Sequence, residues 1–340
     1  MNKTRVFIAM AAAFGCAILP GAPAAQEKKP IELRYTSGAP PKGNPWVMQV
    51  ERFAKDVDEE SKSTLKIQPF FASQLGSEQD TVQQVARGRI DMGGFSGGAA
   101  ALVVPEVALL QMPFFFRSPV EQDCVIDGML KPVAEAFAGK GVQFLGFTEV
   151  GTIDLMGKKP FPSPRDLNGV KAAAYANKVN TMFWSAMGAN PNPLGLPEWI
   201  PAFQTGLAEV VATPITYALP SGLTKVANVA TRLAVWDAPG YSLMNKAVYD
   251  KLSKDHQAAL NRAGDRNPAA KMRAEIRGFE NVLYGMHEKA GGQIVTVTAE
   301  QRAEWRKILE TVYPKMVKEV SAGSEKFFGM IEAGLKACQK

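Results

Sequence analysis

The sequence predicts an α/β protein with two lobes. Short apolar strands alternate with amphipathic helices, for example in 65–98, where a strand, a helix and a second strand follow one another. The 340 residues can bury a large core, and a chain of this length usually divides into two lobes. The segment 146–157 has the pattern of a strand that leaves one lobe for the other. These three observations predict a ligand-binding crevice beyond the carboxyl ends of the strands.

The first 25 residues have the pattern of a secretory signal peptide. Lys3 and Arg5 precede an apolar run over 6–19, and small residues follow at 22–25. The run is shorter than the roughly 20 residues that a membrane span requires. Cys16 lies inside this run, which argues against a lipoprotein signal. We therefore expect an exported mature chain of residues 26–340.

Charge and cysteine content exclude several classes of function. The signal peptide contains two of the 39 basic residues and none of the 33 acidic ones, which leaves a mature net charge of +4. No basic run interleaves with aromatic residues, so nucleic-acid binding is not indicated. The few histidines and cysteines have no metal-ligand spacing, and no phosphate loop or dinucleotide fingerprint occurs, so we expect neither a metal nor a cofactor. Cys124 and Cys338 either pair in an oxidising compartment or stay as isolated thiols.

Two strand ends are candidate ligand contacts. Ser77 has the character of an N-cap and Gly88 that of a helix end, so a helix is predicted between them. The next strand ends at Ser96, where two glycines let a ligand approach the backbone. The first strand ends at Ser37, and a loop rich in proline and glycine then leads to a helix that begins near Trp46. We therefore expect Ser37, Trp46 and Ser96 to lie at the crevice.

A catalytic alternative rests on the segment 94–98. It spells G-x-S-x-G directly after a strand, which is the context of the nucleophilic serine in α/β-hydrolases. His256 and His287 are the two histidines of the chain, and both fall in a predicted helix, whereas a catalytic histidine usually lies on a loop. A serine hydrolase that uses Ser96 is kept as an alternative.

Three runs carry a resemblance to a known family. SQLGSEQDTVQQVARGRIDMG, PFPSPRDLNGVK and LPEWIPAFQTGLAEVV together resemble the substrate-binding proteins of tripartite ATP-independent periplasmic (TRAP) transporters, of the dicarboxylate-binding (DctP) type. The resemblance covers 31–320 in the order and spacing of the family. It implies the two-lobed periplasmic binding protein fold, in which each lobe is a mixed β-sheet flanked by helices and a long helix spans both lobes. The expected division is 26–150 plus 239–278 for lobe I and 151–238 plus 279–340 for lobe II.

The resemblance also implies a function. The protein is expected to be a monomeric periplasmic receptor without catalytic activity that closes on a small organic solute and delivers it to a TRAP membrane permease. Closure of the same kind can also serve a sensor kinase, which remains a second alternative.

The family pattern changes at one position in the expected cleft. The family strand Gly-Leu-Lys-Ile-Arg-Val supplies an arginine that forms a bidentate pair with a substrate carboxylate. Here the matching position is Ala173. The sequence therefore favours a solute that is bulkier, partly aromatic or less acidic, and it does not identify that solute. The resemblance adds these candidate ligand contacts: Glu149, Ala173, Tyr175, Asn177, Thr213 and Trp236.

Overall fold

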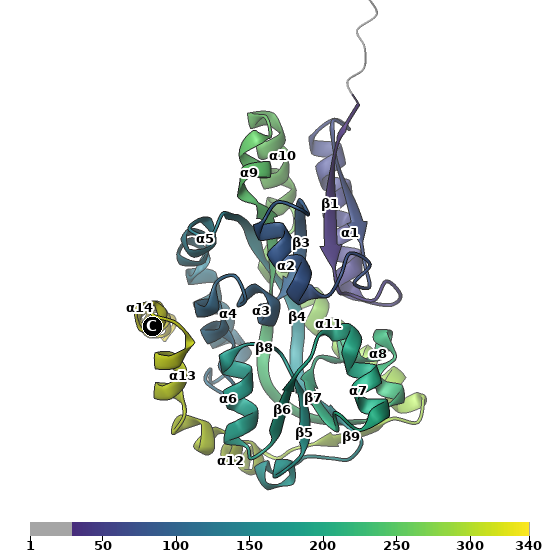
Figure 1. The fold of residues 1–340 in the computed structure, drawn as a ribbon, viewed down its shortest axis with the longest axis vertical. Coiled ribbons are helices and arrows are strands. Elements are labelled where there is room, and N and C mark those ends of the chain that lie inside the picture. Colours follow the sequence, from purple (N-terminus) through teal and green to yellow (C-terminus); the bar gives the residue numbers. More distant parts are fainter. Residues whose placement is uncertain (1–28, 340) are drawn as a thin grey trace, which may run out of the picture.

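The computed structural model describes residues 29–339, so the predicted signal peptide lies outside the described residues. Two groups of elements lie one above the other in Figure 1, and the long strands β4 and β8 run through both. This arrangement confirms the two-lobed α/β prediction. The strands are β1 (Ile31–Ser37), β2 (Leu65–Phe70), β3 (Met92–Ser96), β4 (Val142–Gly157), β5 (Lys171–Ala174), β6 (Asn190–Pro193), β7 (Val210–Thr213), β8 (Val229–Asn245) and β9 (Gln293–Thr296).

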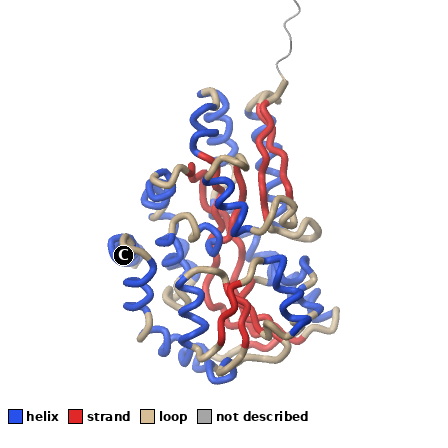
Figure 2. Tube along the Cα trace, viewed as in Figure 1, coloured by secondary structure: helices blue, strands red, loops and turns tan. Residues whose placement is uncertain are grey.

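The helices cover both groups of strands, as the tube in Figure 2 shows. The α-helices are α1 (Pro45–Glu60), α2 (Glu78–Ala86), α3 (Gly97–Ala100), α4 (Pro119–Gly128), α5 (Leu130–Ala138), α6 (Lys178–Ala186), α7 (Trp199–Thr205), α8 (Ile215–Ser221), α9 (Lys246–Lys251), α10 (Lys254–Asp265), α11 (Ala269–Lys289), α12 (Ala299–Glu310), α13 (Tyr313–Val320) and α14 (Ser324–Cys338). The short 3-10 helices are η1 (Pro105–Gln111), η2 (Pro164–Leu167), η3 (Leu196–Glu198) and η4 (Leu223–Lys225).

One continuous mixed sheet joins the lobes. Its strand order is β2-β1-β3-β8-β4-β7-β5-β6, with β9 paired to β8. The first three strands are parallel and belong to one lobe, whereas β7, β5 and β6 form the parallel part of the other. The crossing strands β4 and β8 pair antiparallel along their length. The lobes are thus connected through the sheet itself, at the two strands that lie in its middle.

The crossing strands are irregular where they pass between the lobes. Register shifts interrupt the β4–β8 pairing at three places, one of them between Glu149 and Gly151. Gly151 has φ +125°, and a Cβ there would lie 2.7 Å from the Glu280 carboxylate, so both the backbone conformation and the available space require glycine. A β-bulge bends and twists its strand. The sheet therefore bends where the lobes meet.

Each lobe has its own apolar centre. In one lobe Leu33, Tyr35 and Val57 are buried between the sheet and α1. In the other, Trp199, Phe203 and Ile215 form a second cluster with Ala173. The largest cluster extends from Val82 to Ile331 and includes residues of β4, β8 and the C-terminal helices. Two of the three clusters are thus specific to one lobe each, whereas the largest includes residues of both.

The long C-terminal helical segment is interrupted at Asn267 and Pro268. Helix α10 ends at Asp265 and α11 begins at Ala269, because proline disrupts a helix interior. Helix α11 contacts α1 at one end and α8 and β9 at the other, and so it is the long helix that spans both lobes. Arg52 of α1 forms a bidentate pair with Glu275 of α11, with nitrogen–oxygen distances of 3.0 and 2.9 Å.

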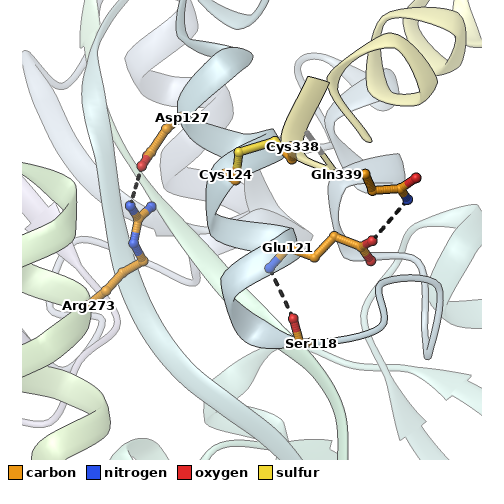
Figure 3. Close-up of a disulfide and its surroundings, with 7 residues drawn as sticks. All are labelled: Ser118, Glu121, Cys124, Asp127, Arg273, Cys338 and Gln339. Atoms are coloured by element: carbon orange, nitrogen blue, oxygen red, sulfur yellow. Dashed lines mark hydrogen bonds and ion pairs between the residues drawn. A yellow bond between two sulfur atoms is a disulfide. The ribbon is translucent and has the colours of Figure 1, made fainter. Parts of the chain in front are cut away.

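The last three helices pass along the side of the molecule. Helix α13 contacts α6 and α14, and α14 packs against α4. A disulfide joins Cys124 of α4 to Cys338 of α14, which settles the alternatives left open for these cysteines (Figure 3). The boundaries at residues 150, 238 and 278 stay a prediction. Within residues 29–339 no helix is both long and apolar enough to cross a membrane.

Candidate functional site

Two adjoining cavities lie between the lobes. Both are lined by Ser96 from the end of β3, Val150 of β4 and Tyr175, which follows β5. The first, here called the Trp236 cavity, is also lined by Gly98, Ala108, Gln111, Pro113, Ile153, Asn177, Val179, Asn180, Trp236 and Ala238. The second, here called the Glu78 cavity, is also lined by Ser37, Gly38, Ala39, Asn44, Trp46, Glu78, Leu196, Pro214, Thr216 and Tyr217.

The lobes touch across these cavities. Gln79 at the start of α2 donates a hydrogen bond from Nε2 to the carbonyl oxygen of Leu194, at 3.2 Å. A Cβ added at Gly98 would lie 2.7 Å from the ring of Tyr175, so glycine is required for this approach. The structure therefore corresponds to a closed arrangement of the lobes.

Glu78 is a buried carboxylate at the start of α2. Its side chain accepts hydrogen bonds from the backbone N–H of Ser96 at 3.1 Å and from the Ser96 hydroxyl at 2.7 Å. The residue is 7 % exposed. Burial raises the pKa of Glu78 above its ordinary value, and the two bonds from Ser96 partly oppose that shift. The ends of α2 and β3 meet here because α2 connects directly to β3 and packs beside it.

Aromatic side chains form much of the wall near Glu78. Trp46, Tyr175 and Tyr217 line the Glu78 cavity, and Trp199 lies buried behind the two tyrosines. The ring of Trp199 makes edge contacts with Tyr175 at 5.4 Å and with Tyr217 at 5.6 Å between centroids. Such packing fixes the positions of the tyrosine rings.

Hydrogen-bond donors gather in the Trp236 cavity. Trp236 is 8 % exposed, and its buried Nε1–H has no hydrogen-bond acceptor in the described part of the chain. Asn177 caps α6 by accepting the backbone N–H of Asn180 at 2.9 Å. The N–H groups of Lys178 and Val179 in the first turn have no partner within the helix, as at every helix start. The start of α6, the Trp236 indole and the side chains of Gln111 and Asn180 thus border one cavity.

A cluster of paired charges lies on the other side of the crossing strands. Arg277 of α11 binds Asp123 of α4 at 2.7 Å and Glu149 of β4 at 3.2 Å, and its Nε lies 4.0 Å from Asp237 of β8. Burial raises the pKa of Glu149 to about 8, and Arg277 opposes this shift. The neighbouring Arg273 pairs with Asp127 of α4 at 2.6 Å (Figure 3). These pairs attach α11 and α4 to both crossing strands.

Six of the nine predicted site residues line the two cavities: Ser37, Trp46, Ser96, Tyr175, Asn177 and Trp236. The other three line neither cavity. Glu149 is ion-paired with Arg277, Ala173 is buried in the cluster that contains Trp199, and Thr213 is buried with a hydroxyl that has no hydrogen-bond partner. A contact of these three with the solute stays a prediction.

Several cavity residues are not predicted from the sequence, among them Glu78, Gln111 and Asn180. An acidic residue in the first turn of a helix, such as Glu78, is ordinarily explained by the helix dipole. Its contact with Ser96 depends on how α2 packs beside β3. A local pattern gives no signal for that contact.

The hydrolase alternative does not agree with the geometry at Ser96. The Ser96 hydroxyl donates to Glu78 and also caps α3, whereas His256 contacts Thr64 and His287 contacts the carbonyl oxygen of Asn228. Neither histidine lines the cavities. Within residues 29–339, no group of three or more His, Cys, Asp or Glu side chains could hold a metal ion.

A cleft between two lobes joined by crossing strands defines the class of periplasmic solute-binding receptors. The family model "Bacterial extracellular solute-binding protein, family 7" (DctP) matches residues 36–320, and the chain belongs to this family. The resemblance to TRAP solute-binding proteins is thereby confirmed. Members are periplasmic substrate-binding proteins, not enzymes, which also removes support for the hydrolase alternative.

Individual relatives agree with this assignment. A solute-binding protein of Verminephrobacter eiseniae is 28 % identical over 76 % of this chain and 80 % of its own length. The 2,3-diketo-L-gulonate-binding periplasmic protein YiaO of Escherichia coli is 27 % identical, with coverage of 81 % and 84 %. The C4-dicarboxylate-binding periplasmic protein DctP of Rhodobacter capsulatus is 22 % identical, with coverage of 95 % and 96 %.

Solved structures share the fold. The sugar acid binding protein DctPAm of Advenella mimigardefordensis, solved with galactonate, has a TM-score of 0.84 at 22 % identity and covers 91 % of this chain and 99 % of its own. A TRAP periplasmic solute-binding protein of Roseobacter denitrificans, solved with β-D-glucuronate, has a TM-score of 0.82 at 23 % identity, with coverage of 90 % and 99 %.

Proposed function

We propose that this protein is the periplasmic receptor of a TRAP transport system, and that it closes on a small organic acid and presents it to the membrane permease. The single observation that carries the proposal is the pair of cavities lined jointly by both lobes. A solute that contacts both lobes binds the closed form better than the open one and shifts the population toward it. The permease then has to recognise only the closed form.

The acid group is proposed to bind in the Trp236 cavity. A carboxylate there would accept hydrogen bonds from the unpartnered Trp236 Nε1–H and from the first N–H groups of α6. These donors would replace the arginine of the family, whose position is Ala173 here. Relatives named for diketogulonate and structures solved with glucuronate or galactonate support an organic acid as the solute class.

The mature chain, residues 26–340, provides the test. Thermal unfolding is measured with organic acids, sugar acids, aromatic acids and neutral polyols, because a solute that binds the folded form raises Tm. For each acid that binds, small-angle scattering should show a smaller radius of gyration with solute than without it. If neutral polyols raise Tm and no acid does, the proposed solute class is wrong.

A second experiment tests the partner. Membrane vesicles that contain the candidate permease should take up labelled solute only when the mature receptor and an ion gradient are both present. Uptake that is the same without the receptor contradicts the proposal. A receptor that binds its solute and supports no uptake, but activates a sensor kinase, would favour signalling instead.

A further inference from the structure

Glu78 is the only charged side chain, among residues 29–339, that lines either cavity. The other lining residues are apolar, aromatic, amide or hydroxyl residues. The cleft therefore has a negative group at one end and no positive side chain to neutralise it.

The fold leaves the charge of Glu78 only partly compensated. Within residues 29–339, both hydrogen bonds to its carboxylate come from Ser96, at 3.1 and 2.7 Å, and no ion pair involves it. Two acceptor positions of an ionised carboxylate then remain for other donors. A buried carboxylate without a counterion is unfavourable, and a bound group of opposite charge relieves that cost.

The walls of the Glu78 cavity also suit a cation. Trp46, Tyr175 and Tyr217 line it, and the contacts of Trp199 hold both tyrosine rings in place. Faces of indole and phenol rings attract organic cations. A hydroxyl group could donate to Glu78, but it would neither neutralise the charge nor interact with the rings in this way.

We propose that the solute carries a positively charged nitrogen that pairs with Glu78, while its carboxylate occupies the Trp236 cavity. The solute is then a zwitterionic organic acid of the amino-acid or betaine type. This inference rests on the proposed function and defines its solute class more narrowly. Ser96 borders both cavities and so marks the point where the two ends of the solute are joined.

The experiment compares acids that differ only at the end away from the carboxylate. Isothermal titration of the mature protein uses γ-aminobutanoate, its trimethylammonio derivative, γ-hydroxybutanoate and the isosteric acid in which carbon replaces the quaternary nitrogen. The series is repeated with shorter and longer chains, and glucuronate and galactonate are included. The nitrogen compounds should bind roughly tenfold to a hundredfold more tightly than their matched neutral partners, as expected for a charge-assisted contact.

The variant Glu78→Gln keeps the size of the side chain and removes its charge. It should abolish the preference for the nitrogen compounds, whereas Asp80→Asn, an exposed carboxylate on the same helix, should leave it unchanged. If Glu78→Gln fails to fold, Tyr217→Leu gives the second test, since losing a ring that faces the cation should reduce the preference for the trimethylammonio compound several-fold.

The outcomes separate the two proposals. If hydroxy or sugar acids bind as tightly as the nitrogen compounds, or if Glu78→Gln keeps the preference, the inference is overturned and the organic-acid receptor stands. If no acid of any kind binds to the wild-type protein, both proposals fail.

Discussion

Two buried glutamates on opposite sides of the crossing strands differ in how their charge is balanced. Glu78 faces the cleft and Glu149 faces α11, and burial raises the pKa of both. Glu149 has Arg277 at 3.2 Å, whereas the partners of Glu78 among the described residues are the hydroxyl and amide of Ser96. The comparison shows that, within residues 29–339, the buried carboxylate that lines a cavity lacks the arginine partner that Glu149 has on the other side.

On β4, a residue that lines the cavities and a residue of the charge cluster around Arg277 are neighbours in the sequence. Successive side chains of a strand point to opposite faces. Val150 lines both cavities, and the preceding Glu149 joins the charge cluster on α11. The crossing strands therefore line the cavities on one face and bind α11 through ion pairs on the other.

Removing Arg277 should have the largest effect on stability. Arg277→Met leaves Glu149, Asp123 and Asp237 without their shared partner, and breaking a buried pair in this way costs about 3–5 kcal/mol. The free energy of unfolding is measured by urea denaturation. Lys246→Met, which removes an exposed i,i+4 pair with Asp250, is the control and should cost less than about 1 kcal/mol. Equal costs for the two variants would contradict a structural role for the cluster.

Removing the disulfide should have the next largest effect. Cys124 and Cys338 are separated by 214 residues, so their bond strongly restricts the unfolded chain, and its loss typically costs about 2–4 kcal/mol. The double variant Cys124→Ala/Cys338→Ala is compared with the reduced wild-type protein, which should show the same loss. Because neither cysteine lines the cavities, solute affinity should not change. A loss of affinity would show that the packing of α14 against α4 influences solute binding in the cleft.

The pH dependence of the free energy of unfolding should reveal the titration of Glu280, another buried acid, which lies on α11. Burial raises the pKa of Glu280 to about 7, although the backbone N–H of Thr152 donates to it. The unfolded chain ionises Glu280 near its ordinary pKa, so between that value and about 7 the folded state holds more protons. Stability must then fall as pH rises through this window, by more than about 1.4 kcal/mol, which corresponds to one pKa unit. Urea denaturation at both ends of the window measures the fall, and Glu280→Gln should reduce it. An unchanged slope in the variant would assign the effect to other groups.

The smallest expected effect concerns the helix that carries Glu78. Ser77 caps α2 through the N–H of Asp80, and its replacement by alanine should cost about 1 kcal/mol. Ser118→Ala removes the equivalent cap of α4 and should cost about as much. Only Ser77→Ala should weaken solute binding, since it loosens the turn that holds the Glu78 carboxylate. Thermal melts and titration calorimetry on both variants check this difference.

Much of the fold could be predicted because strand and helix patterns are local. The strand ends at Ser37 and Ser96 and the crossing strand over 146–157 follow from sequence periodicity and turn residues. The cleft contacts of Ser37, Trp46 and Ser96 follow because strand ends of parallel units meet at one edge.

The rest of the site depends on packing between distant segments. Glu78 and Tyr217 line one cavity although they lie far apart in the sequence, and nothing near Glu78 in the sequence indicates this. The partner of Glu149 lies 128 residues away on α11, so its place in an ion pair could not be foreseen. Pairing of Cys124 with Cys338 was left open for the same reason.

The bond between Cys124 and Cys338 also turns most of the polypeptide into a closed ring. A protease that cuts one exposed loop between these two positions would leave both fragments covalently attached. Electrophoresis of such a nicked sample should show a single band at the original mass without a reducing agent and two smaller bands after thiol treatment. Damage at one loop would therefore leave the receptor in one piece.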